Sequence, residues 1–275
     1  MTQALLAAVF GLLIGSFLNV CIHRWPRDLS VVKPRSHCPS CERTIAWYDN
    51  IPLVSYAVLG GRCRNCRARI SPRYPAVELA AGLLFFYFAL TLGFTLLTLK
   101  MCLFTAMLVA LIFSDLEERI LPDELTLGGT LIGLVFAGFV PVPDIMAQTF
   151  LWLVGAALPD RGRSLAESVF GAALPALFLW GGGWIYHKLR HREGLGLGDV
   201  KLVAMVGSFL GLRGALLTLI LGSVSGSILG YGYIKFTGKD AATYELPFGT
   251  FLGIAGLVAA LTGGKMLDWY GGAGL

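Results

Sequence analysis

The sequence predicts an all-α protein that crosses a membrane about eight times. Hydrophobic residues make up 56% of the 275 residues, whereas Asp, Glu, Lys and Arg together make up 14%. Soluble domains average about 45–50% apolar residues, even with glycine included, and about 25% charged residues. A chain this apolar has more hydrophobic surface than a soluble fold can bury. The composition therefore excludes a soluble enzyme, a disordered or fibrous chain and a nucleic-acid-binding domain.

Long apolar runs mark the expected spans, because about 20 apolar residues cross the hydrocarbon core as a helix. The run 79–114 contains one charged residue, Lys100. As a single helix this run would be nearly twice as long as the hydrocarbon core is thick, so we expect it to form two spans that turn near Gly93. The other expected spans are residues 1–22, 125–143, 168–187, 199–212, 214–234 and 246–264. The 145–159 segment is too short to cross and is predicted to be interfacial or re-entrant.

The distribution of basic residues predicts the orientation. Residues 23–75 contain ten Lys or Arg but three Asp or Glu, within a chain of net charge +5. The positive-inside rule places this loop in the cytoplasm. Counting spans from it places 115–124, 187–198 and 235–245 on the same side and both chain ends outside. The first apolar run precedes its positive charges, so it is predicted to be a retained span rather than a signal peptide.

The loop contains two C-x-x-C pairs, Cys38 with Cys41 and Cys63 with Cys66, which are separated by 21 residues. This spacing is typical of tetrahedral four-cysteine zinc sites. A loop of about fifty residues also needs a metal site or another cross-link for stability, because it cannot build an adequate hydrophobic core alone. We therefore predict a small cytoplasmic zinc-ribbon-like loop domain with one structural Zn(II). Two disulfides are the alternative, which a reducing cytosol disfavours, and the βαβ pattern of a thioredoxin-like redox pair is missing.

Basic residues surround the second cysteine pair, at Arg62, Arg64, Arg67 and Arg69. We expect these side chains to face solvent and to contact anionic lipid head groups. Nucleic acid is not expected as a partner, because the loop lacks interleaved aromatic residues and a longer basic surface.

Two aspartates stand at the predicted cytoplasmic ends of spans. Asp115 ends the second span of the long 79–114 run, and Asp199 begins the 199–212 span. Charges inside or at the edge of spans are scarce, so each is a functional candidate. Two carboxylates held close together in a poorly solvated site can act as general base and general acid, which is what peptide hydrolysis requires. The alternative is that each aspartate is an interfacial cap or topological marker.

Alternating glycines precede the second aspartate, at Gly194, Gly196 and Gly198. Glycines let another backbone approach closely, so this segment could admit an extended substrate strand beside Asp199. A flexible turn between spans is the alternative. The segment does not match the phosphate-binding loop pattern.

Several motifs occur together and in order along the chain. They are GSFLNVCIHRWP (15–26), RSHCPSC (35–41), NIPLVSY (50–56), GRCRNC (61–66), ISPRYPAVE (70–78), DLEERILPD (115–123) and GLGLGDVK (194–201). With these motifs the chain resembles the type IV prepilin peptidases, which are bifunctional leader peptidases and N-methyltransferases. The resemblance extends nearly from end to end, although the 144–163 segment is unlike the compact pattern of that family.

The resemblance implies a GxGD-type aspartyl protease, in which Asp115 and Asp199 are the catalytic pair and Gly196 and Gly198 complete the signature. It implies removal of the short basic leader of type IV prepilins and pseudopilins after a glycine. The new N-terminal residue would then be methylated with S-adenosylmethionine (SAM), and the full four-cysteine loop favours both activities. The implied location is the bacterial inner membrane, as a multi-pass protein with its active site at the cytoplasmic face, in support of pilus biogenesis or type II secretion.

The expected domains are a first span at 1–22, the methyltransferase-associated cysteine loop at 23–75 and a seven-helix membrane peptidase domain at 76–275. The expected partners are prepilins, pseudopilins and the lipid bilayer. A transporter that uses the two aspartates as a proton relay is one alternative, although both residues lie at one face. A peptidase without methyltransferase activity and a non-catalytic scaffold that docks through the loop are others. The sequence has no G-x-G fingerprint that would locate a SAM pocket.

Overall fold

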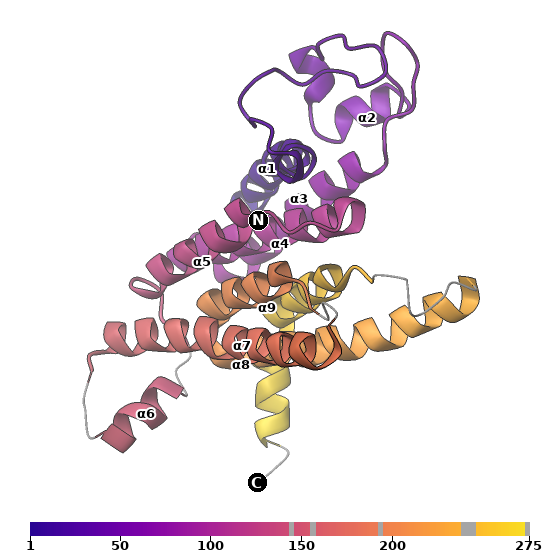
Figure 1. The fold of residues 1–275 in the computed structure, drawn as a ribbon. Helices are drawn as coiled ribbons and strands as arrows, with labels where there is room; N and C mark the ends of the chain where they lie inside the picture. Colours follow the sequence, from indigo (N-terminus) through magenta and orange to yellow (C-terminus); the bar gives the residue numbers. More distant parts are fainter. Residues whose placement is uncertain (143–145, 155–157, 192–194, 238–245, 273–275) are drawn as a thin grey trace. The chain divides into compact units, whose positions relative to one another are not determined.

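The computed structural model describes residues 1–142, 146–154, 158–191, 195–237 and 246–272. Regular structure within these residues is helical, apart from two isolated β-bridges in the cysteine loop. The helices are α1 (Thr2–Arg24), α2 (Val54–Val58), α3 (Arg73–Leu92), α4 (Leu96–Glu118), α5 (Asp123–Ala137), α6 (Met146–Val154), α7 (Asp160–Arg190), α8 (Leu197–Thr237) and α9 (Phe248–Gly272), with 3-10 helices η1 (Trp25–Arg27) and η2 (Trp47–Asn50) (Figure 1). The chain forms two compact units, Met1–Ser114 and Asp115–Leu275.

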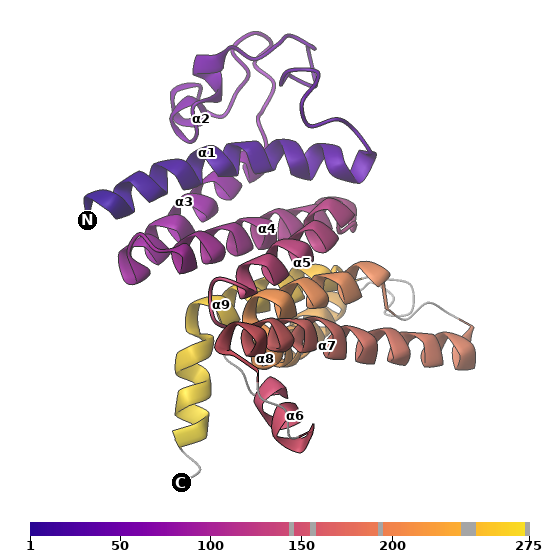
Figure 2. The ribbon, with the colours of Figure 1, turned by 90° about the vertical axis from the view of Figure 1, so that its left-hand side faces the viewer.

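In the first unit, α1 packs directly against α3 (Figure 2). Small residues at the crossing allow this close approach, as in other membrane helix pairs. A Cβ added to Gly15 would lie 2.6 Å from Cα of Glu78 on α3. Asn19 is buried at the same crossing, and its amide donates to the Tyr74 carbonyl at 3.1 Å. The two spans are thus fixed in register by both shape and hydrogen bonding.

Polar side chains at the ends of α1 and α3 hold the cysteine loop. Arg24, at the end of α1, donates to the carbonyls of Ser30 at 2.7 Å and Pro34 at 2.6 Å. Glu78 on α3 accepts the backbone N–H of Leu53 at 2.8 Å, just before α2 begins. The first part and the middle of the loop are therefore anchored to the helices that flank it.

The predicted turn inside the long apolar run is confirmed. Gly93 ends α3 with φ of 68°, a conformation that glycine adopts without steric cost. Thr98 closes the turn by donating from its hydroxyl to the Gly93 carbonyl at 2.6 Å. The run therefore forms two helices, α3 and α4.

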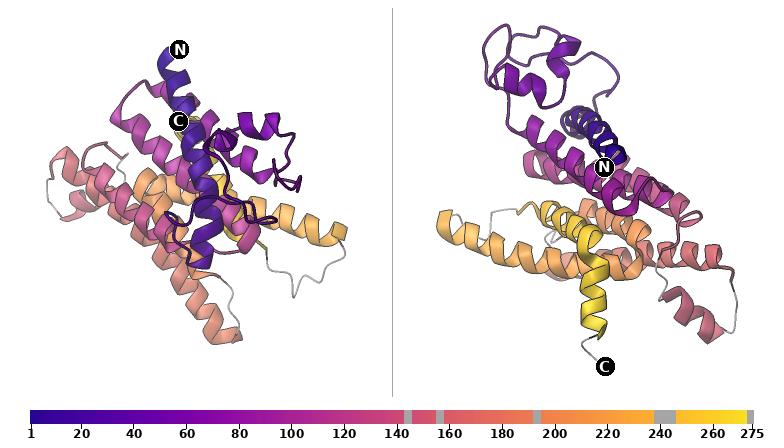
Figure 3. Two further views of the ribbon diagram at one scale, coloured as in Figure 1. Left: turned by 90° about the horizontal axis from the view of Figure 1, so that it is seen from above. Right: turned by 180° about the vertical axis from the view of Figure 1, so that it is seen from behind.

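In the second unit, α7 and α9 both lie beside α8 (Figure 3). The predicted spans 199–212 and 214–234 correspond to the two helical segments of α8, which meet at the non-helical Gly211, with φ of 71° and ψ of −175°. Beside this break, Glu167 of α7 is fully buried, and its Oε1 accepts the N–H of Leu212 at 3.1 Å. Its Oε2 accepts the N–H of Ala147, in the first turn of α6, at 3.0 Å. One carboxylate thus satisfies the starts of two helical segments, whose N–H groups have no intrahelical partners.

The number of spans is not confirmed at eight. Within the described part of the chain, five helices are long and apolar enough to cross a membrane, namely α1 (with η1), α3, α4, α7 and α8. With 15 residues, α5 is shorter than a usual span, as is the apolar Phe248–Gly263 part of α9. The nine residues of α6 are too few to cross, as predicted for that segment. The described residues therefore form a helical fold, and their long apolar helices fit a multi-pass membrane protein.

Replacing Glu167 should destabilise the second unit. In Glu167→Gln the side-chain NH2 would face one of the two N–H groups that the carboxylate now accepts, and a buried unsatisfied donor costs about 1–3 kcal/mol. We expect a loss of several degrees in Tm, at roughly 2–4 °C per kcal/mol for a chain of this size. Thermal unfolding in detergent micelles, followed by tryptophan fluorescence, measures it. The exposed Glu124→Gln is the matched control, and equal midpoints for the two variants would contradict the capping role.

Candidate active site and metal centre

Asp115 lies near the C-terminal end of α4 and is buried, with 5% of its surface exposed. Its Oδ2 accepts two hydrogen bonds from Thr250, one from the backbone N–H at 2.6 Å and one from the hydroxyl at 2.8 Å. Thr250 belongs to the first turn of α9, where backbone N–H groups point out of the helix and favour an anion. Both of these hydrogen bonds fall on Oδ2.

A close approach between backbone and side chain brings α9 to this carboxylate. A Cβ on Gly249 would lie 3.1 Å from Cγ of Asp115 and 2.8 Å from Cδ1 of Leu121. Leu121 also lies against Gly198, where an added Cβ would be 3.2 Å from the leucine side chain. The segment after α4 and the starts of α8 and α9 therefore meet around Leu121. Larger residues at either glycine would push these segments apart.

Asp199 lies in the first turn of α8 and is half-buried. Its N–H donates to the Gly196 carbonyl at 3.2 Å, which folds the glycine segment into the start of the helix. A Cβ on Gly196 would be 3.5 Å from Oδ2 of Asp199, an ordinary contact distance, so Gly196 is not tightly packed beside this carboxylate. Access for an extended substrate strand stays a prediction. Gly194 lies outside the described residues.

The structure brings the two aspartates together. Asp115 and Asp199 come from different helices, 84 positions apart in the chain, yet their carboxylates are close enough to interact electrostatically. One is buried and bonded to Thr250, and the other is half-buried beside the glycines. Such a pair can supply a general base and a general acid to one reacting group.

An ion pair lies beside the aspartates. Lys201, two residues after Asp199, donates to both carboxylate oxygens of Asp123, at 2.7 and 2.9 Å. Asp123 begins α5, and Lys201 lies near the beginning of α8. The pair therefore ties the start of one helix to the start of another, next to Leu121 and Gly198.

The two cysteine pairs are built alike. The N–H of Cys38 donates to the Arg43 carbonyl at 3.0 Å, and the N–H of Cys63 donates to the Ala68 carbonyl at 2.8 Å, in the equivalent position. The residue after each pair has positive φ, 56° in the first and 61° in the second. One antiparallel β-bridge closes each hairpin. This geometry presents both thiols of a pair on one edge of a tight turn.

The four sulfurs of Cys38, Cys41, Cys63 and Cys66 converge, all within 4.8 Å of one another. The Sγ atoms of Cys38 and Cys66 are 3.8 Å apart, and none of the six cysteines forms a disulfide. Zn–S bonds of about 2.3 Å in a tetrahedron require S···S separations of about 3.8 Å. Backbone N–H groups of Cys66 and Asn65 hydrogen-bond to the Cys63 sulfur and lower the pKa of this thiol to about 6. The donor set fits zinc.

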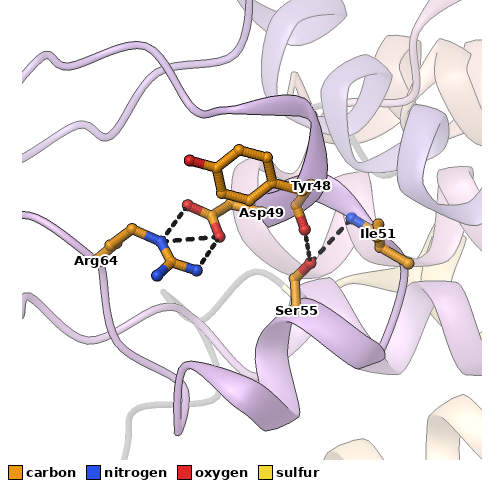
Figure 4. A network of polar contacts seen from close by, with 5 residues as sticks. All are labelled: Tyr48, Asp49, Ile51, Ser55 and Arg64. Carbon is orange, nitrogen blue, oxygen red and sulfur yellow. Dashed lines mark hydrogen bonds and ion pairs between the residues drawn. The ribbon is translucent and has the colours of Figure 1, made fainter.

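An ion pair connects the second cysteine pair to η2 (Figure 4). Arg64 donates through Nε and Nη2 to both oxygens of Asp49, at distances between 2.6 and 3.1 Å, and this contact lowers the pKa of Asp49. The guanidinium also lies over the ring of Tyr48, 5.6 Å from its centroid. On the other side of η2, Ser55 donates to the Tyr48 carbonyl at 2.8 Å and accepts the N–H of Ile51 at 3.0 Å. Together these contacts fix η2 between the second hairpin and α2.

Known proteins match both units. Residues 9–92 match the model of the bacterial peptidase A24 N-terminal domain, and residues 102–231 match that of the type IV leader peptidase family. The chain is 38% identical over 294 residues to the prepilin leader peptidase/N-methyltransferase of Aeromonas salmonicida, an alignment that covers 96% of this chain and 92% of the relative. It belongs to the type IV leader peptidase family. A protein of the same name from Pseudomonas aeruginosa is 36% identical over 285 residues, covering 95% and 91% of the two chains, whereas no solved structure matches.

Some residues of this leader peptidase site were not singled out from the sequence. Thr250 and Gly249 lie 135 and 134 residues after Asp115, and nothing in local spacing joins them to it. The available signal was the Pro-Phe-Gly-Thr run at the start of an apolar segment, which is typical of a helix N-terminus. The Asp123–Lys201 pair had a weaker signal, since both residues lie within the family motifs.

The arrangement of the four cysteines predicts the zinc content of the protein and of its variants. Purified protein should contain close to one zinc per chain, because four thiolates at tetrahedral spacing form a closed site. Cys63→Ser should lose most of that zinc, and the loop should become sensitive to protease because it has little core of its own. Elemental analysis and limited proteolysis measure these effects. Cys102→Ser, on a cysteine buried in α4, is the control and should keep its zinc. Folded wild-type protein without metal would contradict the assignment.

Proposed function

We propose that this chain removes the basic leader from type IV prepilins and pseudopilins after a glycine, and N-methylates the new N-terminal residue with SAM. The main support for the peptidase activity is that Asp115, near the end of α4, and Asp199, at the start of α8, are close enough to interact electrostatically. The relatives named prepilin leader peptidase/N-methyltransferase support the activity as a whole. The proposed biological role is pilus biogenesis or type II secretion.

The proposed location is the bacterial inner membrane, with both aspartates at the cytoplasmic face. The basic excess of residues 23–75 supports this orientation through the positive-inside rule. Within it, 1–22 is the first span, 23–75 the cytoplasmic methyltransferase-associated loop and 76–275 the membrane peptidase domain. A scissile bond between a cytoplasmic leader and a membrane-embedded helix would lie at the depth of the two aspartates.

The proposed hydrolysis uses the two carboxylates in complementary roles. One takes a proton from water as the oxygen attacks the glycine carbonyl carbon, and the other donates a proton to the carbonyl oxygen. The tetrahedral intermediate then collapses and the C–N bond breaks. The leaving amine takes the proton that the first carboxylate removed from water, and the other carboxylate recovers a proton from a hydroxyl of the intermediate as the C=O bond forms. Thr250 holds Oδ2 of Asp115, so Oδ1 can be directed at the reacting atoms. Gly196 leaves room for the extended substrate beside Asp199, whereas Gly198 lets the start of α8 pack against Leu121.

Zinc and SAM have separate proposed roles. Cys38, Cys41, Cys63 and Cys66 would hold Zn(II) as a structural staple, because a four-sulfur site has no open coordination position. SAM would supply an electrophilic methyl group to the amine that cleavage exposes. The residues of this chain then have to position that amine and keep it unprotonated.

The aspartates are the first test. Asp115→Asn and Asp199→Asn should each slow leader removal by about 10²–10⁴-fold or more, since an amide is neither a general base nor a general acid. The double variant should be little worse than either single one, because the pair acts as a unit. Intact-mass analysis of a co-expressed prepilin measures the result, with Glu124→Gln as control. Substantial cleavage by either single variant at matched expression would contradict the proposal that Asp115 and Asp199 are the catalytic pair.

The ion pair beside the aspartates should tune the rate. Lys201→Gln should lower kcat for prepilin cleavage by about two- to fivefold, since a partly exposed ion pair contributes up to about 1 kcal/mol. Lys201→Arg keeps the charge and should retain most of the activity. Initial rates in detergent at low and high salt test this, because the gap between the variants should narrow as salt screens the pair. Equal rates for Gln and Arg variants at low salt would refute the role.

A further inference from the structure

A cavity of about 400 Å³ lies in the first unit, between α1 and the part of the cysteine loop that precedes α2. One wall is a face of α1 that includes Leu13, Phe17 and Val20. The opposite wall comes from the loop and includes Arg35, Trp47 and Asn50. Its volume falls within the range of about 300–1,000 Å³ that is typical of small-molecule sites.

The α1 wall connects the cavity to the membrane. Leu13 and Phe17 are about half exposed, at 52% and 49%, on a helix long and apolar enough to span. A group held at the membrane surface can therefore reach the cavity from this side. The amine produced by leader removal is such a group, because it is the end of an apolar helix lodged in the bilayer.

The loop wall has the chemistry of a nucleoside and amino-acid ligand. The indole of Trp47 is 74% exposed and offers a flat surface on which a purine can stack. The Asn50 side chain can both donate to and accept from a base or ribose. Arg35 is exposed and can bind a carboxylate in a bidentate manner. The other lining arginine, Arg24, already donates to two backbone carbonyls and shapes the loop.

We propose that this cavity is the SAM site, with adenine on Trp47, the methionine carboxylate on Arg35 and the sulfonium directed toward α1. The inference rests on the proposed methyltransferase function and adds its location. Transfer forms the N–CH3 bond from the amine lone pair and breaks the S–CH3 bond, whose electrons stay on sulfur. S-adenosylhomocysteine leaves, and the methylated amine releases a proton to water.

The cavity also explains why methylation would need the zinc loop. Its wall includes Trp47 and Asn50, the first and last residues of η2. Between them in η2, Asp49 pairs with Arg64, which stands between Cys63 and Cys66 in the sequence. The metal centre would thus order the stacking surface through one ion pair, without touching the ligand.

An anionic phospholipid is the competing occupant, because the lining contains two arginines and no acidic residue. A two-chain lipid is much larger than the cavity, and it would not need the exposed indole of Trp47 or the amide of Asn50. SAM can stack its adenine on the indole and form hydrogen bonds with the amide. The net positive lining does not attract the sulfonium, so affinity has to come from stacking and from the carboxylate.

Direct binding tests the location. Isothermal titration of full-length protein in detergent should show binding of S-adenosylhomocysteine, and Trp47→Ala should weaken it about tenfold or more, as expected for loss of one stacked base. Arg35→Gln should weaken it by a similar factor. Trp152→Ala, on an equally exposed tryptophan of α6, is the matched control and should bind like wild type. Zinc content shows whether the cysteine loop of each variant is still folded. If Trp47→Ala loses its zinc, the affinity of Arg35→Gln for S-adenosylhomocysteine becomes the test of the location.

The outcomes separate the two proposals. Wild-type protein that binds no S-adenosylhomocysteine and leaves cleaved pilin unmethylated would overturn the methyltransferase function itself. Wild-type binding that both loop variants retain would overturn only the location. Loss of co-purifying anionic phospholipid from the same variants, with unchanged affinity for S-adenosylhomocysteine, would show that the cavity is a lipid site.

Discussion

Inside a bilayer no water satisfies a buried polar group, so each such group has to find its partner within the protein. This constraint shapes the second unit. The Asp115 carboxylate is held by the first turn of α9, and the Glu167 carboxylate is held by the start of α6 and by the break in α8. In each case a carboxyl group accepts backbone N–H groups at the start of a helical segment, where the helix itself supplies few acceptors. The same contacts that remove an energetic penalty also fix where the helices begin.

Short side chains make these contacts possible. A carboxylate reaches a backbone N–H on another helix only if the two elements approach closely. Gly249 allows this at Asp115, where even a Cβ would crowd the carboxylate, and Gly198 brings α8 against Leu121. The aspartate pair is therefore a product of packing between segments, and its geometry depends on residues that carry no chemistry themselves.

The sequence predicted the elements better than their contacts. The helical class, the turn at Gly93 and the convergence of four cysteines follow from composition, apolar run length and C-x-x-C spacing, which are local signals. For Thr250, Glu167 and the Asp123–Lys201 pair no local signal identified the partner, because each partner lies tens of residues or more away and is determined by helix packing. The structure does not confirm the predicted count of eight spans, because α5 and the apolar part of α9 are shorter than the apolar runs in the sequence. The roles of the aspartates and cysteines stay predictions.

The likeness of the two cysteine hairpins has a consequence for how this loop can change over evolution. Each hairpin sets its own sulfur positions through bonds that begin and end within a few residues. The segment between them, which includes η2 and α2, contributes no sulfur to the metal centre. Substitutions or insertions in that segment can therefore accumulate without disturbing the ligand geometry. The positions of the four sulfurs can therefore stay constant while residues that line one wall of the neighbouring cavity change.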